Sequence, residues 1–337
     1  MRILIAGLGA VGQRHARNLK TLDPAVELHA LRSRRLRHVI TDSLAQDTGR
    51  DVESELGVTV HSTIESALGA NPAAVFICTP SALHMEVALA AAASGCHLFI
   101  EKPVSNTRDG LDRLAALVAD RQLVAAVGCQ WRFHPCVVRL HELLQSGVLG
   151  PVRAAEIRYT EYLPDWHPYE DYRTSYAARA DLGGGVVLTQ IHDYDLAWWL
   201  FGGVRSVNAT GGWLSTLDLD VEDTVDAKLA TSAGPVRVSQ TFAAKPPQRS
   251  ITVDGENGRA TADLLAGRLE VEPDADRGIS LDGYSRNEMF RAEVADFLSC
   301  IARGGLPRVP LADGIAVLDV ALAVKASLAS GRSVSLS

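Results

Sequence analysis

The sequence predicts an α/β protein: an N-terminal Rossmann domain with a doubly wound parallel sheet, followed by a C-terminal α+β domain with an open antiparallel sheet. Short apolar strands alternate with helical segments up to about residue 128, which is the pattern of βαβ units. Beyond that residue, runs of alternating apolar and polar residues replace them. Because 337 residues are also long for a single core, we expect one domain over residues 1–128 and another over 129–337.

Short buried strands separated by helices are expected in the first domain. Residues 3–6 are continuously apolar, which is typical of a parallel strand that is covered on both faces. Ser62 or Thr63 is expected to cap a short helix, and Gly95 to end another. The expected strands are 3–6, 26–31, 58–60, 74–78, 97–100 and 124–127, and the expected helices are 11–22, 43–56, 62–68, 83–94 and 108–120.

Strands with a period of two dominate the second domain. In 224–231, Val225, Ala227 and Leu229 would face one side and polar residues the other, which indicates an antiparallel sheet with one wetter face. Hairpin turns are expected at 232–234 and 256–258. The expected strands are 152–160, 204–213, 224–231, 236–243, 249–254 and 259–264, and the expected helices are 135–146, 288–303 and 314–330.

Composition narrows the function classes. A net charge of -7 does not favour a nucleic-acid or anionic-membrane partner, and the longest apolar run, 87–93, is too short to span a bilayer. The five cysteines have no CxxC spacing, so we expect reduced thiols and no metal site. The chain opens directly on a strand and a glycine loop without a signal peptide, and a cytoplasmic location is expected.

A glycine loop follows the first expected strand and opens a helix. Gly7, Gly9 and Gly12 have the spacing of the dinucleotide fingerprint, in which the first glycine makes the turn, the second admits the pyrophosphate and the third lets the helix pack closely. The amides of the helix start, at Ala10 and Val11, would face the phosphates. The alternative interpretation is a tight strand–helix turn without a ligand.

The end of the second expected strand carries cations where an NAD-binding protein usually has an acid. An acid there would bond the ribose hydroxyl, whereas Arg32, Ser33 and Arg34 suit a 2′-phosphate through guanidinium forks and a hydroxyl donor. We therefore predict that NADP is preferred over NAD. The alternative is a solvated basic loop.

Polar segments follow two neighbouring expected strands: Thr79-Pro80 and Glu101-Lys102-Pro103. The carboxyl ends of parallel strands meet at one sheet edge, where such sheets bind ligands. A lysine on the same edge as the glycine loop indicates a nicotinamide enzyme with its own proton donor.

Five stretches together resemble the glucose–fructose oxidoreductase / inositol dehydrogenase family, often written Gfo/Idh/MocA. The glycine loop alone is common, but the full set in this order is not. The stretches are residues 7–12, Cys78-Thr79-Pro80-Ser81 with His84, Glu101-Lys102-Pro103, residues 130–135, and Gly183-Gly184-Gly185 followed by His192 and Asp195.

The resemblance implies NAD(P)-dependent oxidation or reduction at a carbon that bears a hydroxyl group. It also implies homodimers or homotetramers formed through the C-terminal sheet. It places Lys102 near the nicotinamide and the reacting oxygen and makes His192 the acid/base. Contacts to the cofactor are expected from Gly7, Gly9, Ala10, Val11, Gly12, Arg32, Ser33, Arg34, Thr79, Pro80, His84, Glu101 and Lys102.

The chemistry agrees with these roles. Histidine can take the hydroxyl proton near neutral pH, and an ammonium can stabilise developing negative charge on oxygen. The alternatives are a satisfied buried histidine at a helix start and a structural ion pair of Lys102. Many family members carry an aspartate one turn before the histidine, where this chain has Leu188 and Thr189. Either a nearby aspartate, Asp193 or Asp195, replaces it, or Lys102 is the principal acid/base.

A long aromatic and polar loop, 161–176, precedes the three glycines. Aromatic faces with interspersed polar groups suit a polyhydroxylated ring, and long structured loops are often functional. An oligomer contact that uses tyrosines as anchors is the alternative. The residues expected to bind substrate are Lys102, Arg132, Trp166, Tyr172, Arg173, Tyr176, His192 and Asp195.

The sequence thus predicts an oxidoreductase that acts on a ring hydroxyl or ketone of a sugar, nucleotide sugar, glycoside or cyclitol. Three alternatives stay open. The same scaffold could carry an imine, enone or dihydrodiol reductase, a non-catalytic NADP-sensing regulator, or a glycosidase that uses nicotinamide as a transient oxidant. A sensor does not need an acid/base pair such as Lys102 and His192, so their presence argues against it.

Overall fold

The structure, a computed structural model, describes residues 1–32, 38–167 and 169–336, and the chain divides into two compact units. The first unit comprises Met1–Gln130, His167–Glu170 and Arg286–Ile315, and the second comprises Trp131–Trp166, Asp171–Ser285 and Ala316–Ser337. The expected boundary after residue 128 lies close to the end of the first long segment. Residues 286–315, which the sequence places in the second domain, group with the first unit instead.

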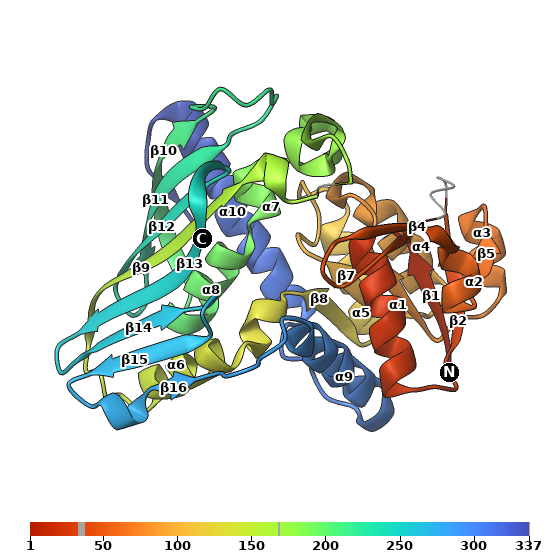
Figure 1. The fold of residues 1–337 in the computed structure, drawn as a ribbon, viewed down its shortest axis with the longest axis horizontal. Coiled ribbons are helices and arrows are strands. Elements are labelled where there is room, and N and C mark those ends of the chain that lie inside the picture. Colours follow the sequence, from red (N-terminus) through yellow and green to blue (C-terminus); the bar gives the residue numbers. More distant parts are fainter. Residues whose placement is uncertain (33–37, 168, 337) are drawn as a thin grey trace. The chain divides into compact units, whose positions relative to one another are not determined.

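A six-stranded parallel sheet forms the centre of the first unit (Figure 1). Its order places β1 between β2 and β6, which is the reversal point of a doubly wound sheet. All of β1 after Arg2 is fully buried, as expected for a strand covered on both faces. In sheet order the strands are β5 (Thr59–His61), β2 (Glu27–Leu31), β1 (Arg2–Ala6), β6 (Ala74–Ile77), β7 (His97–Glu101) and β8 (Ala125–Gly128).

Helices connect and cover these strands. Helix α1 packs against α9, and α4 against α5. Thr63 caps α3, because its hydroxyl accepts a hydrogen bond from the amide of Ser66. The helices of this unit are α1 (Ala10–Leu22), α2 (Val52–Leu56), α3 (Ile64–Gly69), α4 (His84–Ala93), α5 (Leu111–Asp120) and α9 (Asn287–Arg303), and a single 3-10 turn, η1 (Ser81–Leu83), precedes α4.

The helix predicted over residues 43–56 is wrong for most of its length. Strand β4 (Gln46–Asp51) pairs there with β3 (His38–Ile40), and only the five residues of α2 are helical. Thr48 and Gly49 are poor helix formers. Asp51 accepts a hydrogen bond from the amide of Ser54, so it starts a helix instead of continuing one.

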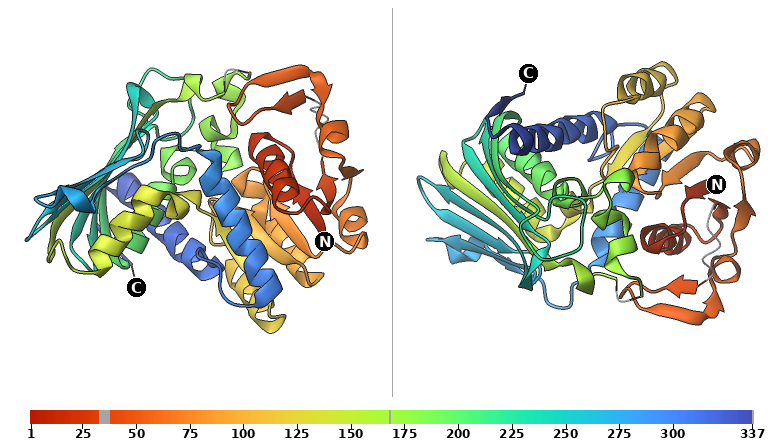
Figure 2. Two further views of the ribbon diagram at one scale, coloured as in Figure 1. Left: turned by 60° about the horizontal axis from the view of Figure 1, so that its bottom comes forward. Right: turned by 90° about the horizontal axis from the view of Figure 1, so that it is seen from above.

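A nine-stranded sheet forms the second unit (Figure 2). Neighbouring strands are antiparallel except β9 and β12, which run parallel, so the sheet is mixed rather than purely antiparallel. A long connection, not a hairpin, joins these two strands. In sheet order the strands are β16 (Ile279–Ser280), β15 (Arg268–Glu272), β14 (Arg259–Asp263), β13 (Ala243–Gly255), β9 (Val152–Tyr162), β12 (Pro235–Thr241), β11 (Thr224–Thr231), β10 (Val204–Gly212) and β17 (Val334–Ser335).

The two faces of this sheet differ as predicted. Val225, Ala227 and Leu229 of β11 are buried, while the opposite face carries ion pairs such as Arg158–Glu156. Helix α6 (Pro135–Gln145) packs on β14 and β15, and α8 (His192–Phe201) packs on β9, β11 and β12. The short helix α7 (Val186–Thr189) precedes α8, and α10 (Leu311–Ser330) begins in the first unit and ends in the second.

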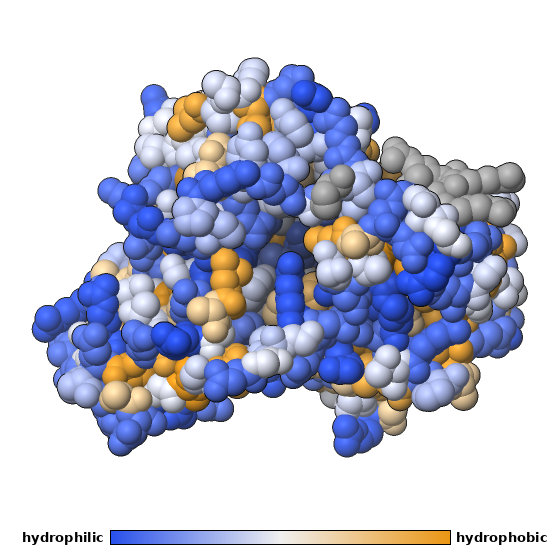
Figure 3. Space-filling model, viewed as in Figure 1, coloured by the Kyte–Doolittle hydropathy of each residue, from blue (hydrophilic) through white to orange (hydrophobic). Residues whose placement is uncertain are grey.

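The surface is mainly polar on the face drawn in Figure 3, with small, separate apolar patches. Scattered exposed apolar side chains are ordinary for a globular protein. No helix among the described residues is long and apolar enough to cross a membrane. All five cysteines are buried as free thiols, as the sequence predicts.

Candidate cofactor and substrate sites

Each glycine of the loop after β1 meets a different structural demand. Gly7 has a φ of 97°, and a Cβ there would lie 2.8 Å from the carbonyl oxygen of Cys78. A Cβ on Gly12 would lie 2.0 Å from the carbonyl oxygen of Gly7. A Cβ on Gly9, in contrast, would meet no heavy atom within 4 Å. Packing therefore requires the outer two glycines, and the open space over the middle one suits the close approach of a pyrophosphate.

The start of α1 offers amides to an anion. The N-cap of this helix is Gly9, which has no side chain that could accept from the first amides. The first turn also contains no acidic residue. Ala10 and Val11, which open the helix, are partly exposed. Unsatisfied amides and the positive end of the helix dipole favour a phosphate at this position.

Thr79 follows β6 with an unsatisfied hydroxyl. Its Oγ1 is buried and has no hydrogen-bond partner in the described structure. Because buried polar groups are normally hydrogen-bonded, this atom is a fitting contact for a bound ligand. Pro80 is partly exposed beside it.

The sequence predicts that His84 contacts the cofactor, but its side chain points into the interior of the unit. It is 1% exposed, with Nδ1 2.9 Å from the carbonyl oxygen of Pro103 and Nε2 2.8 Å from that of Thr79. Burial lowers the pKa of His84, and its bonds to the two carbonyls act in the opposite direction. His84 thus holds the loop after β6 to the loop after β7, and direct contact with a cofactor is not supported.

Lys102 leaves the sheet directly after β7 and is partly buried, and its peptide bond to Pro103 is cis. Glu101 points inward and is only 6% exposed. One of its oxygens lies 2.6 Å from Nε2 of His15, and the other accepts a 3.3 Å hydrogen bond from the amide of Lys102. The prediction that Glu101 contacts the cofactor is therefore not supported, because its carboxylate is occupied inside the unit.

Arg32 follows β2 as expected, but an acid that the sequence analysis did not identify accompanies it. Its Nη1 lies 2.5 Å from Oε1 of Glu53 on α2, and the arginine side chain is 5% exposed. Ser33 and Arg34 lie outside the described residues. A local pattern does not reveal this partner, because Glu53 lies 21 residues from Arg32 and beyond the unexpected strand β4.

His192 is the first residue of α8 and is 4% exposed. The preceding glycines are required for packing: a Cβ on Gly184 would lie 2.5 Å from the carbonyl oxygen of Tyr176, and Gly185 has a φ of 96°. The turn that leads into α7 and α8 is thus packed against the end of the 161–176 loop. This arrangement fixes where the helix carrying His192 begins.

Arg132 and Asp195 bind each other instead of facing outward. Arg132 is 0% exposed, and its Nη2 and Nε lie 2.6 Å and 3.0 Å from the two oxygens of Asp195. The guanidinium also lies 5.8 Å and 5.5 Å from the ring centres of Trp198 and Trp199. Their prediction as substrate-binding residues is therefore not supported, because both groups form a buried ion pair.

A second buried arginine was missed. Nη1 of Arg249 on β13 lies 3.1 Å from Asp193, and Nη2 lies 2.6 Å from the side-chain oxygen of Gln190. Gln240 donates a 2.8 Å hydrogen bond to the other oxygen of Asp193. The sequence does contain a signal for Arg249: it lies two residues before Ile251 on the same strand, so it faces the same buried side of the sheet. Both aspartates proposed to support His192 are thus bound to arginines.

The 161–176 loop is folded into short 3-10 turns, including η3 (Leu163–Asp165), η4 (Tyr172–Thr174) and η5 (Tyr176–Ala178). The ring of Trp166 packs edge-on against Phe242, with centroids 5.0 Å apart. Tyr172 accepts a 3.2 Å hydrogen bond from the amide of Asp218. Arg173 pairs with Asp171 at 2.7 Å, and its side chain is 53% exposed, so it can still meet a ligand. Tyr176 is partly exposed.

The fold and the glycine loop define a dinucleotide-binding protein of the oxidoreductase class. Residues 1–129 match the model of an oxidoreductase family with an NAD-binding Rossmann fold, and residues 137–261 match the model of the GFO/IDH/MocA C-terminal domain. The chain belongs to the Gfo/Idh/MocA family, as the sequence predicts.

Curated relatives span the whole chain. Myo-inositol 2-dehydrogenase of Thermotoga maritima is 29% identical over 356 residues, covering 100% of this chain and 98% of the relative. The scyllo-inositol 2-dehydrogenase (NAD(+)) of Bacillus subtilis is 25% identical over 349 residues, with coverages of 100% and 96%. A solved levoglucosan dehydrogenase in complex with NADH shares the fold, with a TM-score of 0.84 at 21% identity over 100% of this chain and 99% of that one.

Proposed function

We propose that this protein is an NAD(P)-dependent dehydrogenase or reductase. Its substrate is a ring hydroxyl or ketone of a sugar, nucleotide sugar, glycoside or cyclitol. The observation that carries the proposal is the match of both family domains in one chain, together with inositol dehydrogenases that align over its full length. Lys102 at the end of β7 and His192 at the start of α8 supply the groups that the reaction needs.

The residues present fit a dinucleotide. The start of α1 at Gly9, Ala10 and Val11 would hold the pyrophosphate, and the unsatisfied hydroxyl of Thr79 would bond a polar group of the cofactor. When bound, the nicotinamide supplies or accepts the hydride.

The protein's own groups manage the proton and the charge on oxygen. The ammonium of Lys102 would bind the substrate oxygen and stabilise its negative charge. The imidazole of His192 would take the hydroxyl proton in oxidation and return it in reduction. Because Leu188 and Thr189 stand where many relatives carry an aspartate before the histidine, Lys102 carries a larger share of the proton chemistry than in those relatives.

A substrate panel tests the proposal. Purified protein is mixed with NAD or NADP and with sugars, cyclitols, nucleotide sugars and aminoglycosides, and formation of the reduced cofactor is followed by its absorbance. Reduction with at least one polyol is expected. Reactivity confined to imines, enones or dihydrodiols would establish the alternative reductase. Cofactor binding without turnover of any compound would favour the regulator.

Replacing His192 with asparagine is expected to lower kcat by roughly 10²–10⁴-fold, because a general acid/base contributes about this much. Affinity for the reduced cofactor, measured by its fluorescence, should change little. The matched control is His97→Asn. His97 is partly buried, but it lies at the start of β7 and its Nδ1 accepts a hydrogen bond from the amide of Val124. Normal turnover of the His192 variant would reject the acid/base role.

We further propose that NADP is preferred. Support comes from Arg32 after β2, but Glu53 neutralises it in part and would compete with a 2′-phosphate. Arg32→Asp should therefore weaken NADPH binding far more than NADH binding. Glu53→Gln should strengthen NADPH binding by up to about fivefold, because a pair whose carboxylate is still 28% exposed contributes at most about 1 kcal/mol. Titration of both cofactors against both variants measures this, and equal losses for NADPH and NADH in Arg32→Asp would reject the preference.

We also propose a homodimer or homotetramer in the cytoplasm, formed through the sheet of the second unit. Support for the assembly is the exposed face of this sheet, which carries paired charges rather than covering helices. The five free thiols are consistent with a reducing compartment. Light scattering coupled to size exclusion measures the mass, and a monomer at micromolar concentration would contradict the assembly.

A further inference from the structure

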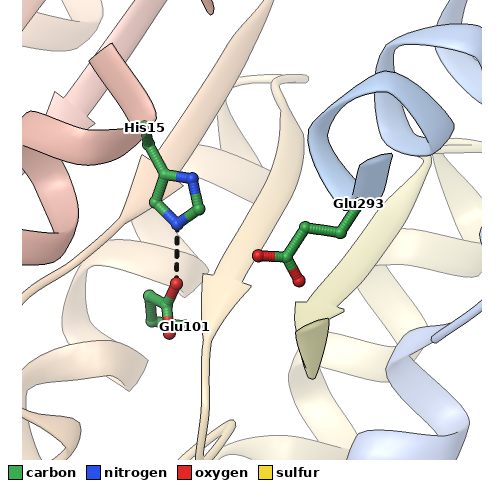
Figure 4. Close-up of side chains that lie close together, drawn as sticks. All are labelled: His15, Glu101 and Glu293. Atoms are coloured by element: carbon green, nitrogen blue, oxygen red, sulfur yellow. Dashed lines mark hydrogen bonds and ion pairs between the residues drawn. The ribbon is translucent and has the colours of Figure 1, made fainter. Parts of the chain in front are cut away.

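Three ionisable side chains meet in the interior of the first unit (Figure 4). His15 comes from α1, Glu101 from the end of β7, and Glu293 from α9. Their exposed fractions are 0%, 6% and 3%. The helix that follows the glycine loop, the strand that leads to Lys102 and the first unit's C-terminal helix therefore converge on one polar cluster, the His15–Glu101–Glu293 cluster.

The surroundings of this cluster are apolar. The ring of His15 lies 5.5 Å from that of Phe76, 5.0 Å from that of Phe99 and 6.2 Å from that of Phe290. In the described structure neither carboxylate oxygen of Glu293 has a hydrogen-bond partner, and neither does Nδ1 of His15. In Figure 4 the carboxylate of Glu293 points toward the other two side chains.

The charge of the cluster determines where a proton resides. An ionised carboxylate without a partner is very costly to bury, and a second carboxylate nearby raises that cost. The pKa of Glu293 lies well above its usual value, mainly because the side chain is buried and also because the carboxylate of Glu101 lies nearby. Cys78 also faces this site, and burial and both carboxylates raise the pKa of its thiol. The buried guanidinium of Arg14 interacts electrostatically with Glu101.

A metal ion fits the cluster less well than a proton. The candidate ligand atoms lie within 4.8 Å of one another. However, Nε2 of His15 and Oε1 of Glu101 are 2.6 Å apart, which is a hydrogen-bond distance. Two ligands of one ion at metal–ligand distances of about 2.0–2.2 Å would stand about 3 Å or more apart.

We propose that Glu293 is a positioning residue for Lys102: it keeps its proton, and as a neutral carboxylic acid within 4.8 Å of the His15–Glu101 pair it adds no second buried negative charge that would displace Glu101. Glu101 transmits the effect, because its second oxygen accepts from the amide of Lys102. The carboxylate of Glu101 lies over Gly128, where an added Cβ would come within 3.0 Å of its Oε1, so a glycine at this position leaves the space that the carboxylate occupies. Only the effect on turnover rests on the proposed function of Lys102.

The first test needs no substrate. Because the folded state holds a proton on Glu293 that the unfolded state releases above a pKa of about 4.5, the unfolding equilibrium shifts toward the unfolded state as the pH rises. Above about pH 5, and as long as the folded protein keeps this proton, the shift approaches tenfold per pH unit for one proton. Glu293→Gln keeps the shape and the neutral charge, so this part of the pH dependence should disappear in urea unfolding.

Two further measurements complete this test. An infrared band of a protonated carboxyl group at neutral pH should be present in the wild type and absent in Glu293→Gln. The matched control, Glu288→Gln, makes the same change at an exposed position of α9 and should keep both the band and the pH dependence. Identical pH dependence in wild type and Glu293→Gln would overturn the proposal. A stoichiometric metal in the purified protein, whose removal destabilises it, would do the same.

The second test measures the link to Lys102. Glu293→Ala should lower kcat on the order of tenfold, because a small displacement of a catalytic group is expensive. Affinity for NADH should stay within about twofold, since no contact to the cofactor is lost. Glu293→Gln should restore most of the turnover. Equal turnover in the alanine and glutamine variants would overturn the positioning role. If the substrate panel yields no turnover at all, the proposed function fails, and the first test still decides whether Glu293 holds a proton.

Discussion

Lys102→Ala is expected to lower kcat on the order of 10²–10⁴-fold, at least as much as His192→Asn. The ammonium would stabilise charge on the substrate oxygen, and one such donor contributes about 10²–10³. A share of the proton transfer adds to this, because Leu188 and Thr189 replace the carboxylate that precedes the histidine in many relatives. The measurement is steady-state turnover with the best substrate of the panel.

The control for this variant separates chemistry from charge. Lys20→Ala removes a partly exposed lysine from the last turn of α1 and should leave kcat unchanged. Lys102→Arg keeps the charge but changes the geometry of the donor, so it should recover only part of the activity. A mild effect of Lys102→Ala beside a severe effect of His192→Asn would reverse the ranking and return the main acid/base role to the histidine.

Local patterns of the sequence were sufficient for most of the fold. The parallel strands were predicted because burial on both faces leaves continuous apolar runs, and the second sheet because burial on one face leaves a period of two. The glycine loop was recognised by its position between a strand and a helix. The alternation at Leu269 and Val271, which form β15, was equally clear but was not assigned to a strand.

Tertiary partners could not be predicted from these patterns. Arg32 was predicted to bind a 2′-phosphate, but its partner Glu53, on a helix that follows an unexpected strand, was not predicted. Arg132 resembled a substrate ligand because it belongs to a family motif, yet 63 residues separate it from the aspartate that it binds. The direction in which the side chains of Glu101 and His84 point depends on packing between elements, which a single sequence does not reveal.

Asp195→Asn is expected to be the most destabilising polar substitution in the second unit. It removes the carboxylate charge that pairs with the fully buried guanidinium of Arg132, and breaking a buried pair in this way costs about 3–5 kcal/mol. Unfolding in urea, followed by circular dichroism, gives the change in free energy. Asp274→Asn is the matched control, because it breaks the exposed pair with Arg277 outside the sheet and should cost at most about 1 kcal/mol.

A double variant distinguishes the cost of an orphaned charge from a loss of packing. Arg132→Met combined with Asp195→Leu removes both charges and keeps apolar volume, so it should recover most of the stability lost in Asp195→Asn. Helix α8 also carries His192, one turn before Asp195, so turnover should fall in the single variant and recover in the double variant if the pair serves to hold this helix. A double variant that is stable but inactive would instead show that the charges themselves act on the substrate, as the sequence predicts for Arg132 and Asp195.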